Sequence, residues 1–272
     1  MGIFNGYLIA SDFDGTFAGG NGEIPQRNID KIKYYISEGG KFTVSTGRTF
    51  QGFHKYDPAY INAPVLLCNG VTAYDYEKKE MIFNLGMGRN ALSAADRIHE
   101  VYPDVSIEVY PFGKTYVYSP CEKTDAHLIN QDIEFKITEN GSSIETPVMK
   151  MMLYAGADGH DILADIAENV IADFEGVSYI RGFKKWLEIV GEGADKGTGL
   201  HALGSALGID DDKLIAVGDG YNDVDMLLSV ENSFVPENGC EKAKECAKYI
   251  VCSNDDGCIA DVIEILEKKI CT

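Results

Sequence analysis

Short apolar runs that end abruptly in polar residues constrain the fold of this chain more than any other feature. Three such runs, each of four or five residues, have the length and composition of buried strands. They lie at residues 7–11, before Asp12; at residues 42–45, before Thr46; and at residues 214–217, before Gly218 and Asp219. If the runs are parallel strands of one sheet, the polar residues that follow them meet at the carboxyl edge of that sheet, where such sheets bind ligands.

Helical patterns alternate with these strands at both ends of the chain. Ile29, Ile32 and Ile36 repeat on one helical face, and further helices are expected at residues 197–207 and 259–269. A further apolar run at residues 65–68 is expected to be a strand, and Asn69-Gly70 after it indicates a hairpin. In the middle of the chain, hairpin-like strands and grouped helices, one of them expected at residues 162–174, replace the strict alternation, which indicates an α+β layer. We therefore predict an α/β protein with a Rossmann-like parallel core at residues 1–84 and 189–272. Residues 85–188 are expected to form an inserted α+β cap domain.

Charge and composition narrow the class of partner. The chain has 24 basic and 43 acidic residues, a formal net charge of −19, which disfavours nucleic acid and anionic membranes as partners. No apolar run approaches the roughly 20 residues that span a bilayer, and the N-terminus lacks the basic region of a secretory signal. A cytoplasmic protein is expected. The seven cysteines form no C-x-x-C pair and are expected to be reduced thiols.

Four carboxylates follow two of the predicted strands. Asp12 and Asp14 follow the first run, and Asp219 and Asp223 follow the run at residues 214–217. Carboxylates held close together remain ionised at low cost only when a cation lies between them. Magnesium prefers oxygen ligands, so a few carboxylates and a substrate phosphate suit it. The pattern predicts a Mg²⁺ site at this edge of the sheet.

The same residues suit phosphoryl transfer. A carboxylate nucleophile can form an aspartyl-phosphate, and a second carboxylate can protonate the leaving oxygen and later activate water. Thr46, the Gly47 amide and Lys196 offer donors for phosphoryl oxygens. Each motif by itself is also typical of a turn, a helix cap or a solvated lysine. Their joint occurrence, in order and each near the end of a strand, favours the site.

The sequence motifs at these strand ends resemble those of the haloacid dehalogenase (HAD) superfamily. Further short motifs resemble its Cof-type branch, HAD-IIB. The four motifs are Asp12-Phe-Asp14-Gly-Thr16, Ser45-Thr46-Gly47-Arg48, Lys196-Gly197 and Gly218-Asp219-Gly220-Tyr221-Asn222-Asp223. The branch is indicated by Asn69-Gly70, by Leu187-Glu188-Ile189, by Val235-Pro-Glu-Asn238 and by Asp255-Asp-Gly257. The resemblance covers essentially the whole chain and is weakest between residues 85 and 185.

The resemblance implies a role for each matching residue. Asp12 would be the nucleophile and a magnesium ligand, and Asp14 the general acid and base, which binds the metal through its carbonyl. Thr46, Gly47, Lys196, Asn222 and the backbone of Phe13 would bind the phosphoryl group, and Arg48 would reach the leaving group. Asp219 would bind Mg²⁺ directly, and Asp223 either directly or through water.

The expected activity is hydrolysis of a phosphomonoester of a small soluble metabolite, such as a sugar phosphate. Two alternatives stay open: a phosphomutase or phosphotransferase of the same superfamily, and a non-catalytic protein that binds a phosphorylated ligand. Presence of both Asp12 and Asp14 disfavours the second. Arg181, Lys184, Lys185 and Trp186 either contact a polar substrate or form a solvated basic hinge. The inserted cap would close over the site and set substrate specificity by selecting the leaving group.

Overall fold

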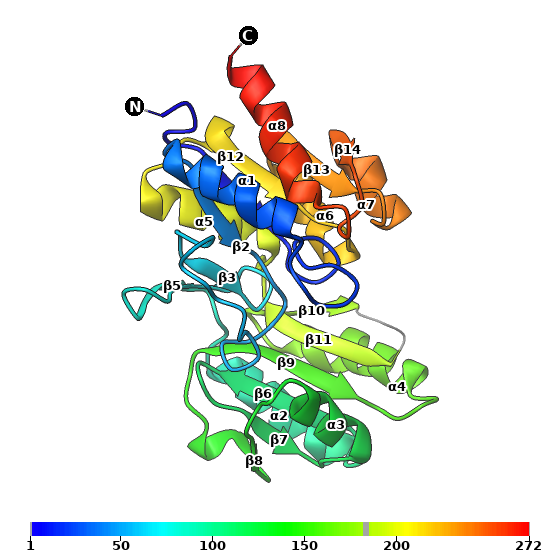
Figure 1. Ribbon diagram of the computed structural model, residues 1–272. Helices are drawn as coiled ribbons and strands as arrows, with labels where there is room; N and C mark the ends of the chain where they lie inside the picture. Colours follow the sequence, from blue (N-terminus) through cyan, green and yellow to red (C-terminus); the bar gives the residue numbers. More distant parts are fainter. Residues whose placement is uncertain (1, 182–184, 272) are drawn as a thin grey trace. The chain divides into compact units, whose positions relative to one another are not determined.

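The computed structural model describes residues 2–181 and 185–271, which form two compact units (Figure 1). Unit 1 comprises Met1–Gly47, Lys55–Phe83 and Asp195–Thr272, and unit 2 comprises Arg48–His54 and Asn84–Ala194. Both ends of the chain therefore belong to unit 1. Lys184, one of the basic residues singled out above, lies outside the described residues.

The main sheet of unit 1 has five parallel strands in the order β14-β13-β12-β1-β2. The strands are β1 (Leu8–Ser11), β2 (Lys41–Val44), β12 (Leu214–Val217), β13 (Asn232–Pro236) and β14 (Tyr249–Val251). Both β1 and β12 are buried along their whole length, which explains why they read as uninterrupted apolar runs. The predicted parallel α/β core is confirmed.

Helices cover both faces of this sheet. They are α1 (Gln26–Ser37), α5 (Lys196–Leu207), α6 (Val224–Ser229), α7 (Glu241–Cys246) and α8 (Cys258–Ile270). On one face, Leu200 and Leu203 of α5 pack with Leu8 and Leu214 in a buried apolar cluster. On the other face, α1 and α8 lie side by side (Figure 1), and Arg27 forms an ion pair with Asp261 between them.

A small second sheet in unit 1 follows β2. Its strands are β3 (Val65–Leu67), β4 (Thr72–Asp75) and β5 (Glu80–Asn84), of which the sequence predicted only the first. Strands β3 and β4 are antiparallel and form the hairpin that Asn69-Gly70 indicates. Asn69 and Gly70 have φ angles of 56° and 85°, the left-handed conformation that this residue pair adopts readily.

Unit 2 contains a six-stranded sheet in the order β10-β11-β9-β6-β7-β8. The strands are β6 (Ser106–Pro111), β7 (Tyr116–Tyr118), β8 (Lys136–Ile137), β9 (Val148–Tyr154), β10 (Val177–Arg181) and β11 (Trp186–Gly191). Its helices are α2 (Arg89–Val101), α3 (Glu122–Asn130) and α4 (His160–Asp165). Neighbouring strands are antiparallel except for β7 and β8, so the unit is α+β as expected.

Two details of unit 2 differ from the sequence prediction. The single helix expected at residues 162–174 is α4 followed by a π-helical segment, Ile166–Val170, and a 3₁₀ turn, Ile171–Asp173. The expected boundary between residues 188 and 189 falls within β11, which pairs with β9 on one side and β10 on the other. Because both partners belong to unit 2, β11 stays with that unit to its end.

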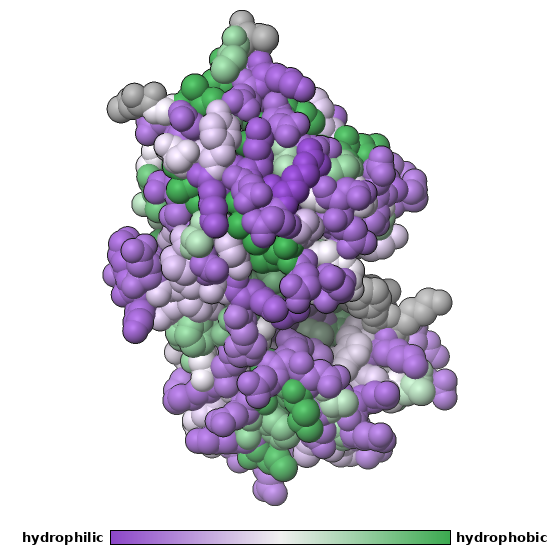
Figure 2. Space-filling model, in the orientation of Figure 1, coloured by the Kyte–Doolittle hydropathy of each residue, from purple (hydrophilic) through white to green (hydrophobic). Residues whose placement is uncertain are grey.

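The described surface is mostly hydrophilic on the face that Figure 2 shows, in keeping with the acidic composition. Apolar side chains that are exposed, such as Leu228 and Ile129, are scattered. Among the helices of residues 2–181 and 185–271, none combines the length and apolar character needed to cross a membrane.

Leu153→Ala should destabilise unit 2, because Leu153 is fully buried in β9 within the main apolar cluster of the unit. The expected loss is about 2–5 kcal/mol of unfolding free energy. Trp186, the one tryptophan of the chain, lies on β11 opposite Tyr154, so its fluorescence during urea unfolding reports on this unit. Ile137→Ala, on the 68% exposed Ile137, is the control and should change stability by less than about 0.5 kcal/mol. Equal losses in both variants would contradict this prediction.

Candidate active site

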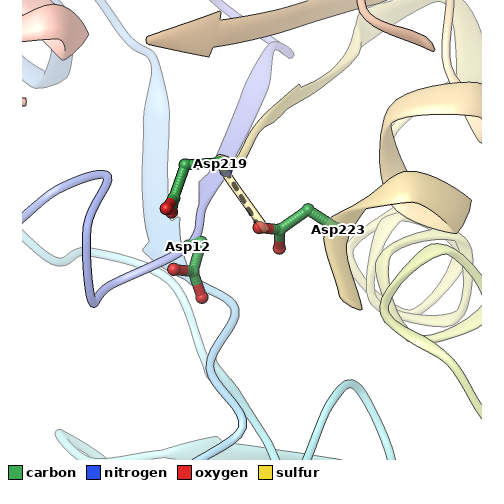
Figure 3. A group of neighbouring side chains, drawn as sticks. All are labelled: Asp12, Asp219 and Asp223. Carbon is green, nitrogen blue, oxygen red and sulfur yellow. Dashed lines mark hydrogen bonds between the residues drawn. The ribbon is translucent and has the colours of Figure 1, made fainter. Parts of the chain in front are cut away.

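Three aspartates meet at the carboxyl edge of the five-stranded sheet. Strands β1 and β12 are parallel neighbours with Ser11 opposite Val217, so the residues that follow them lie together. Asp12, Asp219 and Asp223 each bring a carboxylate oxygen within 4.8 Å of the others (Figure 3). Of the four carboxylates that the sequence predicts at this edge, the structure brings together those of Asp12, Asp219 and Asp223.

Lys196 lies between two of these carboxylates. Its Nζ donates to Asp12 Oδ1 at 2.5 Å and to Asp223 Oδ1 at 2.7 Å. Lys196 is the first residue of α5, and the Asp195 side chain caps that helix by accepting from the Thr198 amide. The lysine is fully buried. Its complete burial makes it part of the unit 1 interior as well as of the site.

The Asp223 carboxylate also organises the loop after β12. Its Oδ2 accepts from the backbone amides of Asp219 at 3.0 Å and Gly220 at 2.8 Å. A Cβ atom on Gly218 would lie 2.4 Å from the Asp223 side chain, so this close approach requires glycine. Asp223 thus closes its own loop through one oxygen and contacts Lys196 through the other.

The Asp219 carboxylate is held from the opposite side. Thr16 donates through Oγ1 to Asp219 Oδ1 at 2.6 Å. Gly15 has a φ angle of 84°, and a Cβ there would lie 2.6 Å from Asp219 Oδ2. The residues after Asp12 therefore leave room for the Asp219 carboxylate and donate to it.

Burial and mutual repulsion shape the charges of the cluster. Burial raises the pKa of Asp12 to about 8, and the Asp223 and Asp219 carboxylates add to this, while the Lys196 ammonium acts in the opposite direction. Burial also raises the pKa of Asp219. Burial alone would lower the pKa of Lys196, but the Asp12 and Asp223 carboxylates outweigh it and raise the pKa above its usual value.

The donor set fits a divalent cation. With all groups ionised, three carboxylates and one ammonium leave two uncompensated negative charges in a largely buried cluster. Close carboxylates of this kind are stable as anions only beside further positive charge. Oxygen ligands from a few carboxylates are what Mg²⁺ uses in proteins. The Asp12, Asp219 and Asp223 side chains are therefore suited to hold it.

Asn69 links two predicted phosphate-binding residues, Thr46 and Asn222, a role that the sequence did not reveal. Asn69 donates its backbone amide to the Thr46 carbonyl at 3.0 Å, and its Oδ1 accepts from Asn222 Nδ2 at 3.1 Å. A Cβ on Gly47 would lie 3.1 Å from the same Oδ1. Asn69 was noted only as a hairpin residue and as part of the family resemblance. An asparagine at a left-handed turn position beside two strand ends was the available signal.

The other predicted site residues differ in placement. Phe13 is buried, whereas the Asp14 side chain is exposed and is not one of the three clustered carboxylates. The metal contact predicted for Asp14 uses its carbonyl, so its role stays a prediction. Arg48 belongs to unit 2, where its Nη1 donates to the Gly52 carbonyl at 3.4 Å. Its predicted contact with the leaving group also stays a prediction.

Lys196→Met should destabilise unit 1 by about 3–5 kcal/mol, because it leaves Asp12 and Asp223 buried without their cation. Urea unfolding followed by far-ultraviolet circular dichroism measures the loss. Lys213→Met is the control, since Lys213 pairs with Asp210 at the surface and its loss should lower stability far less. Combining Lys196→Met with Asp223→Asn should recover part of the loss. Stability like that of the control would show that the pairs contribute little.

Comparison with known proteins identifies the family of this chain. Residues 9–263 match the family model of the haloacid dehalogenase-like hydrolases. The putative phosphatase M6_Spy0533 of Streptococcus pyogenes is 25% identical, with 94% of this chain and 96% of that protein covered. The phosphatase YbjI of Escherichia coli, named for 5-amino-6-(5-phospho-D-ribitylamino)uracil, is 25% identical, with 94% of each chain covered.

Solved structures share the fold. A haloacid dehalogenase-like hydrolase from Bacteroides thetaiotaomicron superposes with a TM-score of 0.82 at 23% identity, covering 96% of this chain and 99% of that one. The sugar phosphatase BT4131, described as HAD subclass IIB, gives a TM-score of 0.80 at 17% identity with the same coverage. Because the family model spans most of the chain, including the strand ends that carry Asp12 and Asp219, this protein belongs to the haloacid dehalogenase-like hydrolases.

Proposed function

We propose that this enzyme is a magnesium-dependent phosphomonoester hydrolase that forms an aspartyl-phosphate on Asp12. The observation that carries the proposal is the Asp12 carboxylate, which follows a parallel strand, touches the buried Lys196 ammonium and lies beside Asp219 and Asp223. A buried carboxylate with a cation on one oxygen is oriented for attack through the other. Relatives that carry the name phosphatase support the reaction class.

The reaction is proposed in two displacements. In the first, Asp12 Oδ2 bonds to phosphorus while the bond from phosphorus to the leaving oxygen breaks, and Asp14 gives its proton to that oxygen. In the second, the Asp14 carboxylate takes a proton from water, the water oxygen bonds to phosphorus, and the bond to Asp12 breaks. Lys196 keeps Asp12 Oδ1 in place throughout, and Asp14 ends the cycle protonated again.

The charge of the phosphoryl group needs several positive partners. Mg²⁺, held by Asp12, Asp219, Asp223 and the Asp14 carbonyl, would supply positive charge beside the reacting phosphoryl oxygens. We propose that Thr46, the Gly47 amide, Lys196, Asn222 and the Phe13 backbone donate to those oxygens. The bond between Asn222 and Asn69 supports this assignment, because it places Asn222 near the turn that follows Thr46.

The proposed substrate is a small phosphorylated metabolite with a sugar or sugar-alcohol chain. The name of the Escherichia coli relative contains a phosphoribityl group, and BT4131 is named a sugar phosphatase. A panel of phosphorylated sugars, sugar alcohols and nucleotides, assayed for inorganic phosphate, tests the proposal. One phosphate released for each ester consumed supports a hydrolase, whereas phosphate moved to a second hydroxyl would identify a phosphomutase. That unit 2 determines substrate specificity stays a prediction, and so does the location of the protein in the cytoplasm.

Esters with different leaving groups should distinguish the roles of Asp12 and Asp14, the two aspartates that follow β1. Asp12→Asn should abolish turnover and any covalent phosphoenzyme, because the amide is a poor nucleophile. Asp14→Asn should lower kcat/KM by roughly 10²–10⁴-fold for esters whose leaving oxygen needs a proton, and much less for p-nitrophenyl phosphate. Steady-state kinetics and acid-quenched labelling with ³²P-phosphate esters measure both. A wild-type rate in Asp12→Asn would exclude Asp12 as the nucleophile.

Binding of Mg²⁺ should release a proton. Because the pKa of Asp12 is raised to about 8, the metal-free protein holds a proton there at neutral pH that a bound cation displaces. Apparent Mg²⁺ affinity should therefore rise between about pH 6 and pH 8. Calorimetric titration in two buffers with different ionisation enthalpies detects the proton, and EDTA should abolish turnover reversibly. Identical heats in both buffers, or full turnover in EDTA, would count against the assigned site.

A further inference from the structure

The backbone that carries Asp14 is folded into a compact loop at residues 12–18, here called the Asp12 loop. The Phe17 amide donates to the Asp12 carbonyl at 3.2 Å, and the Ala18 amide donates to the Phe13 carbonyl at 2.9 Å. Asp14 and Ala18 form a backbone bridge. The backbone on which Asp14 lies is therefore linked to Ala18 through the carbonyl of Phe13.

Four successive carbonyls of the Asp12 loop accept hydrogen bonds from four different side chains elsewhere in unit 1. The donors are Asn238 Nδ2 to Gly15 at 2.8 Å, Cys258 Sγ to Thr16 at 3.2 Å, Asn28 Nδ2 to Phe17 at 3.4 Å and Asn254 Nδ2 to Ala18 at 2.9 Å. None of the four donors belongs to the motifs that carry the chemistry. Together they hold residues 15–18 of the loop, with one hydrogen bond to each carbonyl.

The donors are themselves braced against one another and against α8. Asn238 Oδ1 accepts from the Asn254 amide at 2.9 Å, and Asn28 Oδ1 accepts from the Ala260 amide at 3.1 Å. Asn28 and Asn254 are 0% and 5% exposed. The side-chain amide of Asn28 is bonded at both ends and so has a single orientation, while Asn254 is held by its backbone amide and by its Nδ2. An unsatisfied buried polar group costs about 1–3 kcal/mol.

We propose that Asn254, supported by Asn238 and Asn28, is a positioning residue that sets the reach of Asp14 toward the leaving oxygen. The proposal rests on the proposed function of Asp14 as general acid. The Asp14 side chain is exposed, and any shift of the backbone that bears it moves the carboxyl group. Asn254 fastens Ala18, and the bridge between Ala18 and Asp14 carries that constraint to the acid. Small displacements of a positioned group cost large factors in rate.

A positioning role and a purely structural role predict different kinetics. Loss of the Asn254 donor should slow the step in which the leaving oxygen takes a proton, and it should spare esters that leave as stable anions. Phenyl phosphate and p-nitrophenyl phosphate form a matched pair for this test. They have nearly the same shape, but phenolate is as basic as the tyrosine side chain, with a pKa of about 10, whereas p-nitrophenolate is a far weaker base.

The experiment measures kcat/KM of Asn254→Ala for both esters, because this constant covers the steps up to phosphoryl transfer. The expected loss is roughly tenfold or more for phenyl phosphate and less than about threefold for p-nitrophenyl phosphate. Asn254→Asp, which keeps the shape but removes the donor, should show at least the same selective loss. If Asn254→Ala does not fold, Asn238→Ala at an exposed position replaces it in the same comparison.

Asn62 provides the matched control. Like Asn254, it donates from Nδ2 to a backbone carbonyl, that of Gly40 at 3.1 Å. Its Oδ1 accepts from the Phe42 amide at 2.8 Å, so its bonds lie at the start of β2 and not at the Asp12 loop. Asn62→Ala and Asn62→Asp should lower stability without changing the ratio of the two kcat/KM values. An unchanged ratio in Asn254→Ala, whether or not both values fall, would overturn the proposal.

Failure of the proposed function would appear differently. In that case wild-type enzyme releases no phosphate from either ester, or Asp14→Asn fails to discriminate between them, and the proposal about Asn254 falls with it. If wild type and Asp14→Asn behave as expected, the ratio in Asn254→Ala tests Asn254 alone.

Discussion

The contact between Lys196 and the carboxylates of Asp12 and Asp223 is the interaction on which the rest of the site depends. It joins the end of β1, the start of α5 and the turn after β12, segments separated by 184 and 27 residues in the chain. An uncompensated charge in this position would be costly, so the three segments can pack closely only when the Lys196 ammonium has a carboxylate partner. The same contact therefore stabilises unit 1 and orients the nucleophile.

Around this contact, side chains form hydrogen bonds with the backbone amides and carbonyls of the neighbouring loops. Asp223 accepts amides of its own loop, Asn69 joins the turn after β2 to Asn222, and four side chains bind successive carbonyls of the Asp12 loop. The reactive side chains stand on loops, yet these loops are held from behind by hydrogen bonds. Such support is what a reaction needs when its groups must be placed within fractions of an ångström.

Strand ends and acidic motifs were predictable because a buried parallel strand reads as an uninterrupted apolar run, whatever surrounds it. The continuity of helices was less predictable. No pattern in residues 162–174 indicates the π-helical segment, which depends on how the helix packs. The predicted unit boundary fell within β11 because the apolar pattern of this strand suits either unit. Its pairing with β9 and β10 assigns it to unit 2. Strands β4 and β5 are short and partly exposed, so their pattern was weak.

The sequence by itself determined the parallel α/β core, the order of its motifs and the chemical types gathered at its edge, because these follow from local patterns and from one family resemblance. Only the tertiary structure decided that Lys196 is wholly buried, that Asn69 links two strand ends and that Asn28, Asn238 and Asn254 brace the Asp12 loop. Hydrogen bonds between residues more than 200 positions apart leave no periodic trace in a chain. An asparagine that binds a distant carbonyl looks the same in sequence as one that faces water.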